Sequence, residues 1–346
     1  MKHQTTRYGE IPFYKIGTFG NTADAFISKK LFLEYKTKYS FPKKGDILIS
    51  ASGTIGRAVI YDGKPAYFQD SNIVWIDNDE TLVKNDFLFY AYSNVKWNTE
   101  HTTILRLYND NFRNTLIPLP PLNEQSAIAN ILSGLDRYLC TLDALILKKE
   151  SVKKALSFEL LSQRKRLKGF NQAWQRVRLG DIANYLTSNL SVEQITQQGK
   201  IKVYDVNNFI GYTDTTFISD KPYISIVKDG SVGRVRILPP KTNILSTMGA
   251  LIANHKTTTE FLFYLLSNFD FKNFTSGSII PHIYFKDYKE KTIFLPPLNE
   301  QSAIANILSA LDNEITSLKN KKRQFENIKK ALNHDLMSAK IRVLEK

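Results

Sequence analysis

The chain contains one stretch of fifteen residues twice, without a single difference. Leu119–Ser133 reads LPPLNEQSAIANILS, and Leu295–Ser309 repeats it. A repeat at a long fixed offset indicates a fold that uses the same structural unit twice. The segments that precede the two copies correspond only loosely. The sequence therefore predicts two divergent globular modules, each followed by a nearly identical connector.

Each connector has the pattern of a long amphipathic helix. It opens with Pro-Pro, which suits the first turn of a helix but not its interior. Apolar residues follow at alternating steps of four and three, which is the spacing of a heptad seam. We expect the seam at Ile128, Leu132, Leu135, Leu139, Leu142 and Ile146, continued by Val152, Leu156 and Leu160, and in the second copy at Ile304, Leu308, Leu311, Ile315, Leu318, Phe325, Leu332 and Leu336. Each helix is predicted to run for about 45 residues, and the first to stop at Gly169.

An apolar seam of this length needs a partner, and the other connector is the most economical one. An antiparallel coiled coil would then place the modules at opposite ends; the alternative is that each helix packs on its own module. The predicted fold is mixed α/β (α+β), with two globular domains joined by two long helices and a pseudo-two-fold internal repeat. The expected boundaries are 1–118 and 171–294 for the modules, and 119–170 and 295–346 for the connectors.

The modules are expected to contain short strands around a glycine turn. A strand over Gly45–Ser50 leads into such a turn before Arg57, and Tyr223–Val227 leads into its counterpart before Arg234. The first module carries an insertion over 31–43, which we expect to be a surface loop. The second opens with WQRVRLGDI (174–182), which has no counterpart in the first, so we expect the first module to be shortened or to leave that edge open.

Charge and composition favour an extended anionic partner. The formal net charge is +14 and is spread along the whole chain. No run of apolar residues is long enough to span a membrane. The single cysteine, Cys140, fits a reducing cytoplasm. The sequence has no Walker loop, dinucleotide fingerprint, nucleophile elbow or metal-ligand spacing, and nothing in the spacing of its Asp and Glu residues suggests a nuclease site. We therefore expect no catalytic residue, no metal ligand and no cofactor in this chain.

Several of these features together resemble a known family. The paired LPPLNEQ connectors, the Gly-Asp-Ile openings at 45–47 and 180–182, and the Gly-Thr/Ser-Ile/Val-Gly-Arg turns at 53–57 and 230–234 are similar to those of the specificity subunit of type I restriction–modification enzymes. The likeness extends over essentially the whole chain.

That resemblance implies a DNA reader in two halves. Each module would be a target recognition domain for one half of a split site in double-stranded DNA, and the coiled coil would set the unread spacer. Two methyltransferase subunits would dock on the repeated connectors, and restriction/motor subunits would complete the complex. S-adenosylmethionine, ATP and magnesium would bind those partners, which would methylate a flipped adenine.

Candidate DNA contacts are basic, aromatic or hydroxyl residues in turns and loops. Arg can pair with guanine, Tyr and Ser can reach phosphate, and cations interleaved with aromatics suit a DNA-facing loop. The candidates are Lys36, Lys38, Tyr39 and Lys43 in the insertion with Lys44 directly after it, Arg57 and Arg234 after the turns, Arg106, Tyr108, His282 and Tyr284 just before the connectors, and Ser276 and Ser278. Each could instead be an ordinary solvated or packed side chain.

Polar residues that are identical in both connectors are candidates for a shared docking surface. They are Asn123, Glu124, Gln125 and Asn130, with Asn299, Glu300, Gln301 and Asn306. A recent duplication would also explain them. Two other classes of function stay open, namely a stand-alone sequence-specific or architectural DNA-binding protein and a coiled-coil adaptor without a nucleic-acid role. Neither of these needs two matched docking sites.

Overall fold

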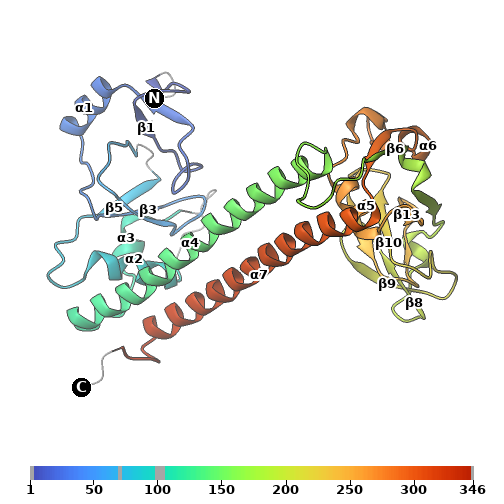
Figure 1. Ribbon diagram of the computed structural model, residues 1–346. Coiled ribbons are helices and arrows are strands. Elements are labelled where there is room, and N and C mark those ends of the chain that lie inside the picture. The colour runs from blue at the N-terminus through green and yellow to red at the C-terminus, as the bar shows by residue number, and fades with distance from the viewer. Residues whose placement is uncertain (1–3, 69–71, 98–105, 344–346) are drawn as a thin grey trace. The chain divides into compact units, whose positions relative to one another are not determined.

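The computed structural model describes residues 4–68, 72–97 and 106–343. It divides into two compact units. Unit 1 comprises Met1–Asp143 and Asn320–Lys346, and unit 2 comprises Ala144–Lys319. Two 40-residue helices, α4 (Leu122–Leu161) and α7 (Leu298–Met337), are shared by both units. Each unit therefore consists of one module and one stretch of each helix (Figure 1).

Unit 1 is built from small layers of strands and helices. A hairpin of β1 (Ile11–Phe13) and β2 (Ala25–Ile27) leads into α1 (Lys29–Lys38). An antiparallel sheet in the order β4-β3-β5 follows, with β3 (Ile47–Ser50) between β4 (Ala58–Ile60) and β5 (Ile73–Ile76). Helix α2 (Asn85–Asn94) covers this sheet, and the short α3 (Asn109–Arg113) precedes the connector.

Unit 2 contains the same central motif with more strands around it. Its main sheet has the order β11-β10-β13-β7, formed by β11 (Val235–Leu238), β10 (Tyr223–Val227), β13 (Met248–Ala253) and β7 (Ala183–Thr187). Every residue of β10 is buried, because α5 (Thr259–Ser267) packs on one face and a second apolar cluster fills the other. This explains why four of its five residues, YISIV, are apolar or aromatic.

The smaller elements of unit 2 complete the module. A three-stranded sheet joins β12 (Asn243–Ile244), β8 (Ile201–Tyr204) and β9 (Phe209–Thr213), and β14 (Thr275–Ser276) pairs with β15 (His282–Ile283). The short α6 (Phe285–Tyr288) follows β15. Strand β6 (Gln175–Arg178) pairs with β16 (Thr292–Leu295), the strand that leads into α7.

The two long helices pair antiparallel within each unit. In unit 2, Glu150 lies 2.6 Å from Lys319, and Lys153, one turn further along α4, pairs with Asp312, so residue numbers rise along α4 as they fall along α7. In unit 1, Asp136 pairs with Lys329 and Asp143 lies 2.7 Å from Lys322, which gives the same direction (Figure 1). The expected helix pairing is therefore present in both units, while the same helices also pack on the modules.

The predicted seam is correct with one exception. Ile128, Leu132, Leu142 and Ile146 are buried in α4, and Ile304, Leu308 and Ile315 are buried in α7. Val152 was expected to prolong the seam but is exposed. None of the helices in the described residues is long and apolar enough to cross a membrane.

The helices stop earlier than predicted. Helix α4 ends at Leu161 rather than at Gly169. Gln163 takes a left-handed conformation there (φ 63°), and Ala339 does the same after α7 (φ 54°). A residue with positive φ closes the last helical turn and redirects the chain, although glycine is the residue usually found in this role.

The insertion over 31–43 is not a loop, as we had expected, but is mostly helix α1. Ser28 caps it by accepting a hydrogen bond from the backbone N–H of Leu31 at 3.2 Å. Phe32 and Tyr35 turn inward and join the hydrophobic cluster beneath β1 and β2. Short sequence segments that are both basic and aromatic fit a loop or an amphipathic helix equally well, and packing decides between them.

The segment that leads into the connector of unit 1 differs from its counterpart in unit 2. Residues 116–119 correspond in the sequence repeat to β16 of unit 2, but they form no strand, and Leu116 is 94% exposed. Within the described residues of unit 1, no strand takes the place of β6 beside them.

Candidate nucleic-acid interface

In unit 2, the predicted contact residues His282 and Tyr284 lie beside the glycine turn. Ile283 between them is buried, so the two flanking side chains point outward, as alternation along an extended segment requires. The backbone N–H of Ile283 donates to the carbonyl of Lys228 at 2.9 Å. His282 Nδ1 lies 2.8 Å from Asp229 Oδ1. Because a carboxylate accepts, this contact makes Nδ1 the protonated nitrogen and leaves Nε2 to a ligand.

Unit 1 repeats this arrangement with different side chains. Arg106 and Tyr108 flank the buried Leu107, whose N–H donates to the carbonyl of Ala51 at 2.8 Å. Arg106 forms a β-bridge with Ser52 in the place of the His282–Asp229 bridge. Its guanidinium lies 5.8 Å from the centre of the Tyr108 ring. The two modules thus present an outward cation or imidazole and a tyrosine at the same position, as the sequence alignment predicted.

Both glycine turns pack against an aromatic ring, which explains why they need glycine. A Cβ at Gly56 would lie 2.2 Å from Trp97, and one at Gly233 would lie 2.6 Å from Phe271. Both residues also have positive φ. The turns are therefore held in one conformation beside the outward residues. This also fixes the backbone at Arg57 and Arg234, which directly follow the turns.

Those two arginines are engaged within the chain. Arg57 Nη1 donates to the carbonyl of Phe19 at 3.0 Å. Arg234 Nη2 donates to the Asn207 side-chain oxygen at 2.9 Å, and Arg236 Nη1 donates to the Asn207 carbonyl at the same distance. Arg236 also lies over the Tyr204 ring, 5.2 Å from its centre. Arg236 was not among the predicted contacts, although two arginines at a spacing of two on a strand share one face.

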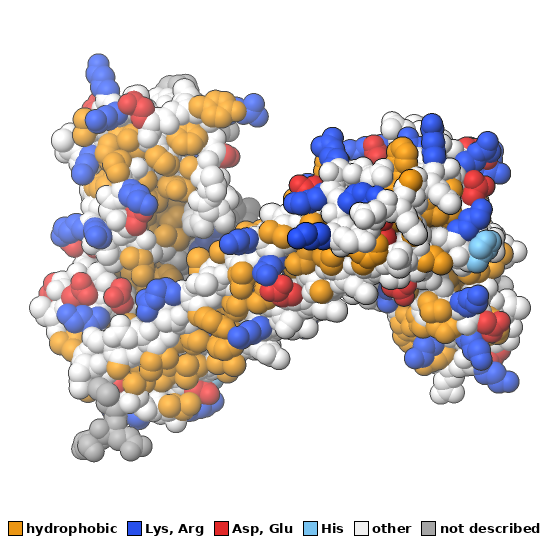
Figure 2. Space-filling view, in the orientation of Figure 1, with side chains coloured by type: hydrophobic (Ala, Val, Ile, Leu, Met, Phe, Trp, Pro, Cys, Tyr) orange, Lys and Arg blue, Asp and Glu red, His pale blue; other side chains and the backbone are white. Residues whose placement is uncertain are grey.

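The remaining DNA candidates lie in two other places. Lys36 lies 5.3 Å from the centre of the Phe41 ring and Lys38 lies 5.6 Å from that of Tyr39, which places them around α1. Lys43 pairs with Asp77 at 3.1 Å, and Lys44 is exposed. Ser276 and Ser278 are exposed near the tip of the β14–β15 hairpin, on the same segment as His282. On the visible face of unit 2, Lys and Arg side chains are interspersed with hydrophobic ones (Figure 2).

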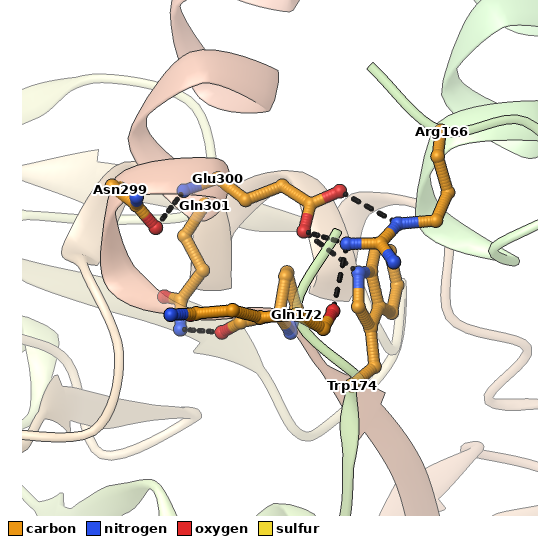
Figure 3. A network of polar contacts seen from close by, with 7 residues as sticks. Arg166, Gln172, Trp174, Asn299, Glu300 and Gln301 are labelled. Carbon is orange, nitrogen blue, oxygen red and sulfur yellow. Dashed lines mark hydrogen bonds and ion pairs between the residues drawn. The ribbon is translucent and has the colours of Figure 1, made fainter. Parts of the chain in front are cut away.

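Half of the candidate docking residues are buried. Glu300 is 0% exposed; it accepts from Arg166 Nη2 at 2.6 Å and from Trp174 Nε1 at 3.0 Å (Figure 3). In unit 1, Glu124 is likewise buried and accepts from Arg342 Nη2 at 2.6 Å. The Arg342 guanidinium holds the pKa of the Glu124 carboxyl below its ordinary value. The docking role that we predicted for both glutamates is therefore wrong.

The two glutamines have a similar internal role. Gln125 accepts from the N–H of Lys84 at 2.8 Å and donates to the carbonyl of Leu82 at 3.0 Å. Gln301 accepts from the N–H of Thr258 at 3.0 Å and donates to the carbonyl of Lys256 at 2.9 Å. Each ties the start of a connector to the start of α2 or α5, so neither side chain is available for docking and this part of the prediction is also wrong.

A second set of identical connector residues is exposed. It contains the four predicted asparagines together with a serine and two apolar residues in each copy. The members are Leu122, Asn123, Ser126, Asn130 and Ile131 in α4, and Leu298, Asn299, Ser302, Asn306 and Ile307 in α7. We call these two sets the connector faces. Exposed leucine and isoleucine next to small polar residues are typical of a surface that a protein partner covers.

A three-residue contact holds the helix pair to each module. Tyr264 of α5 donates to Asp312 of α7 at 2.9 Å, and Lys153 of α4 bonds to the same carboxylate. In unit 1, Tyr90, Asp136 and Lys329 make the same contacts. Burial and the neighbouring carboxylate raise the pKa of both tyrosines, which keeps the phenols protonated as donors. We call these the Tyr–Asp–Lys contacts.

Each unit thus carries an outward cation or imidazole and a tyrosine on a similar framework, next to a connector that the other unit repeats. The family model for the type I restriction modification DNA specificity domain matches residues 1–150 and 171–327. The chain therefore belongs to the family of type I restriction–modification specificity subunits.

Individual relatives agree with this assignment. A putative type I restriction enzyme specificity subunit of Haemophilus influenzae is 65% identical over 133 residues, which is 38% of this chain and about a third (34%) of that protein. The putative MjaX specificity subunit of Methanocaldococcus jannaschii is 30% identical over 337 residues, covering 86% of this chain and 79% of its own. A crystal structure of the type I restriction-modification S subunit from M. genitalium has the same fold, with a TM-score of 0.64 at 20% identity over 97% of this chain and 91% of that one.

Proposed function

We propose that this chain is the DNA-specificity subunit of a type I restriction–modification complex, in which each module reads one half of a split double-stranded site. The observation that carries this proposal is the repeated outward pair, Arg106 with Tyr108 and His282 with Tyr284, on the same framework in two separately folded units. Identical framework with different outward side chains is what two different half-sites require.

The outward pairs have the chemistry for this task. A guanidinium forms two parallel bonds with guanine in the major groove, whereas an imidazole Nε2 makes a single bond with a base edge. The tyrosine hydroxyls can reach the phosphate backbone and fix the position of the module. The net charge of +14 supplies the salt-dependent attraction to the duplex that any sequence-specific contact needs.

The connector faces serve the assembly. Two matched surfaces in one chain suit two copies of one partner, and we infer that this partner is the methyltransferase subunit. Restriction/motor subunits then join that complex. The methyl transfer, ATP hydrolysis and DNA cleavage belong to these partners with their S-adenosylmethionine, ATP and magnesium, and this chain supplies no catalytic group. We place the complex in the cytoplasm, a compartment that suits the lone free cysteine, Cys140.

The DNA role is tested by co-expression with the methyltransferase subunit, followed by single-molecule sequencing of host DNA for N6-methyladenine. We expect a split motif with modified adenine on both strands, which disappears when this chain is deleted. An intact methyltransferase whose methylation pattern does not depend on this chain would contradict the proposal.

The docking role is tested separately by mass measurement of the purified complex. Asn130→Arg places a long cation on one connector face and should leave one methyltransferase subunit bound in place of two. Asn306→Arg should do the same at the other face, and the double variant should bind none. Arg323→Ala, on an exposed part of α7 outside both faces, is the matched control and should retain two. Retention of both subunits by the double variant would contradict docking at these faces.

A further inference from the structure

Two large apolar side chains stand in solvent at the tip of the β14–β15 hairpin in unit 2. Ile279 is 92% exposed and Ile280 is 55% exposed. The burial of apolar surface is the main favourable contribution to folding, so side chains this exposed add little to the stability of the module. Their presence at a turn needs another explanation.

The tip is held in place by its base. Strand pairing joins Thr275 to Ile283 and Ser276 to His282. The carbonyl of Pro281, which directly follows the tip, accepts a hydrogen bond from the N–H of Gly230 at 2.9 Å. Ile283 is buried in the main core of the unit. The hairpin is therefore a fixed projection from the glycine turn.

The turn that carries the isoleucines contains a close backbone contact. Gly277 has a φ of 90°, and a Cβ there would lie 2.3 Å from the Ile280 carbonyl oxygen. Only glycine fits this close approach. Ser278 and Ile279 lie between these two residues in the chain, and both are exposed.

Polar and cationic groups surround the apolar tip. His282 and Tyr284 follow it on the same segment, and the Lys286 Nζ lies 5.5 Å from the centre of the Tyr284 ring. Lys272 is exposed just before β14. A patch that docks another protein is usually a broad apolar area. Two apolar side chains above a cationic base suit a nucleic-acid groove, in which cations meet phosphates while an apolar group meets the stacked bases.

We propose that Ile279 is an apolar wedge that enters a base step of the half-site read by unit 2 and partly unstacks it, with Ile280 filling the groove beside it. This inference rests on the proposed function. Unstacking is easiest at pyrimidine–purine steps, so the wedge favours half-sites with such a step at a fixed distance from the bases that His282 reads. The preference of unit 2 for its half-site would then come from the deformability of the DNA as well as from hydrogen bonds to the bases.

The test uses the full chain in complex with its methyltransferase subunit, and duplexes that carry the methylation motif. 2-Aminopurine is placed in turn at each position of the half-site except the methylated adenine, and its fluorescence reports unstacking. Wild type should brighten the probe at one step. Ile279→Ala should remove that signal and weaken binding about tenfold, the loss expected when one apolar side chain no longer becomes buried.

Val192→Ala is the matched control, because Val192 is 66% exposed elsewhere in unit 2; it should keep both the signal and the affinity. Wild-type fluorescence that persists in Ile279→Ala would overturn the wedge. So would a variant complex that loses its methyltransferase subunit but keeps its DNA affinity, since the tip would then be a protein contact. Failure of wild type itself to bind the motif would overturn the proposed function, and the wedge with it.

Discussion

At the scale of single residues, identity between the two connectors has two separate causes. Glu124 and Gln125, with Glu300 and Gln301, are identical because each copy must anchor its helix to a module. The exposed residues of the connector faces have no such internal task. The sequence could not separate these groups, because the arginine that binds Glu124 is 218 positions away. The only signal was that Arg166 and Arg342 are themselves a matched pair in the repeat.

We expect the Glu300 anchor to be important for stability. Glu300→Gln leaves Arg166 and Trp174 facing a neutral amide, and should lower the free energy of unfolding by about 2–3 kcal/mol, because a half-buried cation loses its counter-charge. Chemical denaturation followed by circular dichroism measures this change. Glu314→Gln is the control, since its pair with Lys149 is more exposed and should cost less than about 1 kcal/mol. Equal losses in the two variants would contradict the assignment.

The corresponding anchor in unit 1 should give a pH-dependent stability. The pKa of Glu124 is lowered in the folded chain, mainly by its bond to Arg342. A lowered pKa stabilises the fold above the unfolded-state value of 4.5 and loses that contribution as pH falls below it.

Arg342→Gln should therefore be less stable than wild type at pH 7, and the difference should shrink as pH falls from about 5 toward 3. Thermal unfolding across this range measures it. Arg323→Gln, which removes an exposed arginine bonded only to Asn320 among the described residues, should show no such trend. A difference between wild type and Arg342→Gln that is constant with pH would rule out Glu124 as its cause.

At the scale of elements, the heptad seam could be predicted from the sequence, because periodicity is a property of consecutive residues. Strand β10 and the glycine turns could be predicted for the same reason, since each is a local sequence pattern. The end of α4 could not be predicted, because a glutamine that takes the left-handed conformation, here Gln163, gives no sequence signal comparable to that of glycine. The role of Lys153 and Lys329 could not be predicted either, because each bonds a carboxylate on the opposite helix. Partners across a helix pair depend on register, which periodicity alone leaves open.

The Tyr–Asp–Lys contacts should fix that register. In unit 2, Asp312→Lys sets two lysines against each other, and Lys153→Asp sets two carboxylates against each other. Each single variant should lower the free energy of unfolding by about 2 kcal/mol, and the double variant should recover part of it, because the ion pair re-forms while the Tyr264 bond is lost.

Denaturant unfolding of the four proteins in this cycle gives the coupling free energy. Tyr264→Phe supplies the matched control for the missing hydroxyl and should cost about 1 kcal/mol on its own. Losses in the two single variants that simply add in the double variant would show that Lys153 and Asp312 do not interact.

At the scale of the whole molecule, the chain is two units with separate cores and a common reading framework. The repeat predicted this arrangement, and the offset also predicted which outward residues correspond. What the sequence could not give was the burial pattern around Arg106 and His282, which depends on the buried Leu107 and Ile283 and on backbone bonds to a distant turn. Nor did it single out Ile279 and Ile280 at the hairpin tip, because isoleucine in a short segment usually indicates core.

Separate units should give separable specificity. Arg106 lies in unit 1 and His282 in unit 2, each bound to its own glycine turn. Arg106→Ala should therefore relax base preference in one half of the methylated motif by about 1–3 kcal/mol per lost contact, and His282→Ala should relax it only in the other half. Sequencing of N6-methyladenine in cells that express each variant reads both halves at once. Arg323→Ala, outside both reading surfaces, should leave the motif unchanged. If either reading variant altered both halves equally, the modules would not act independently.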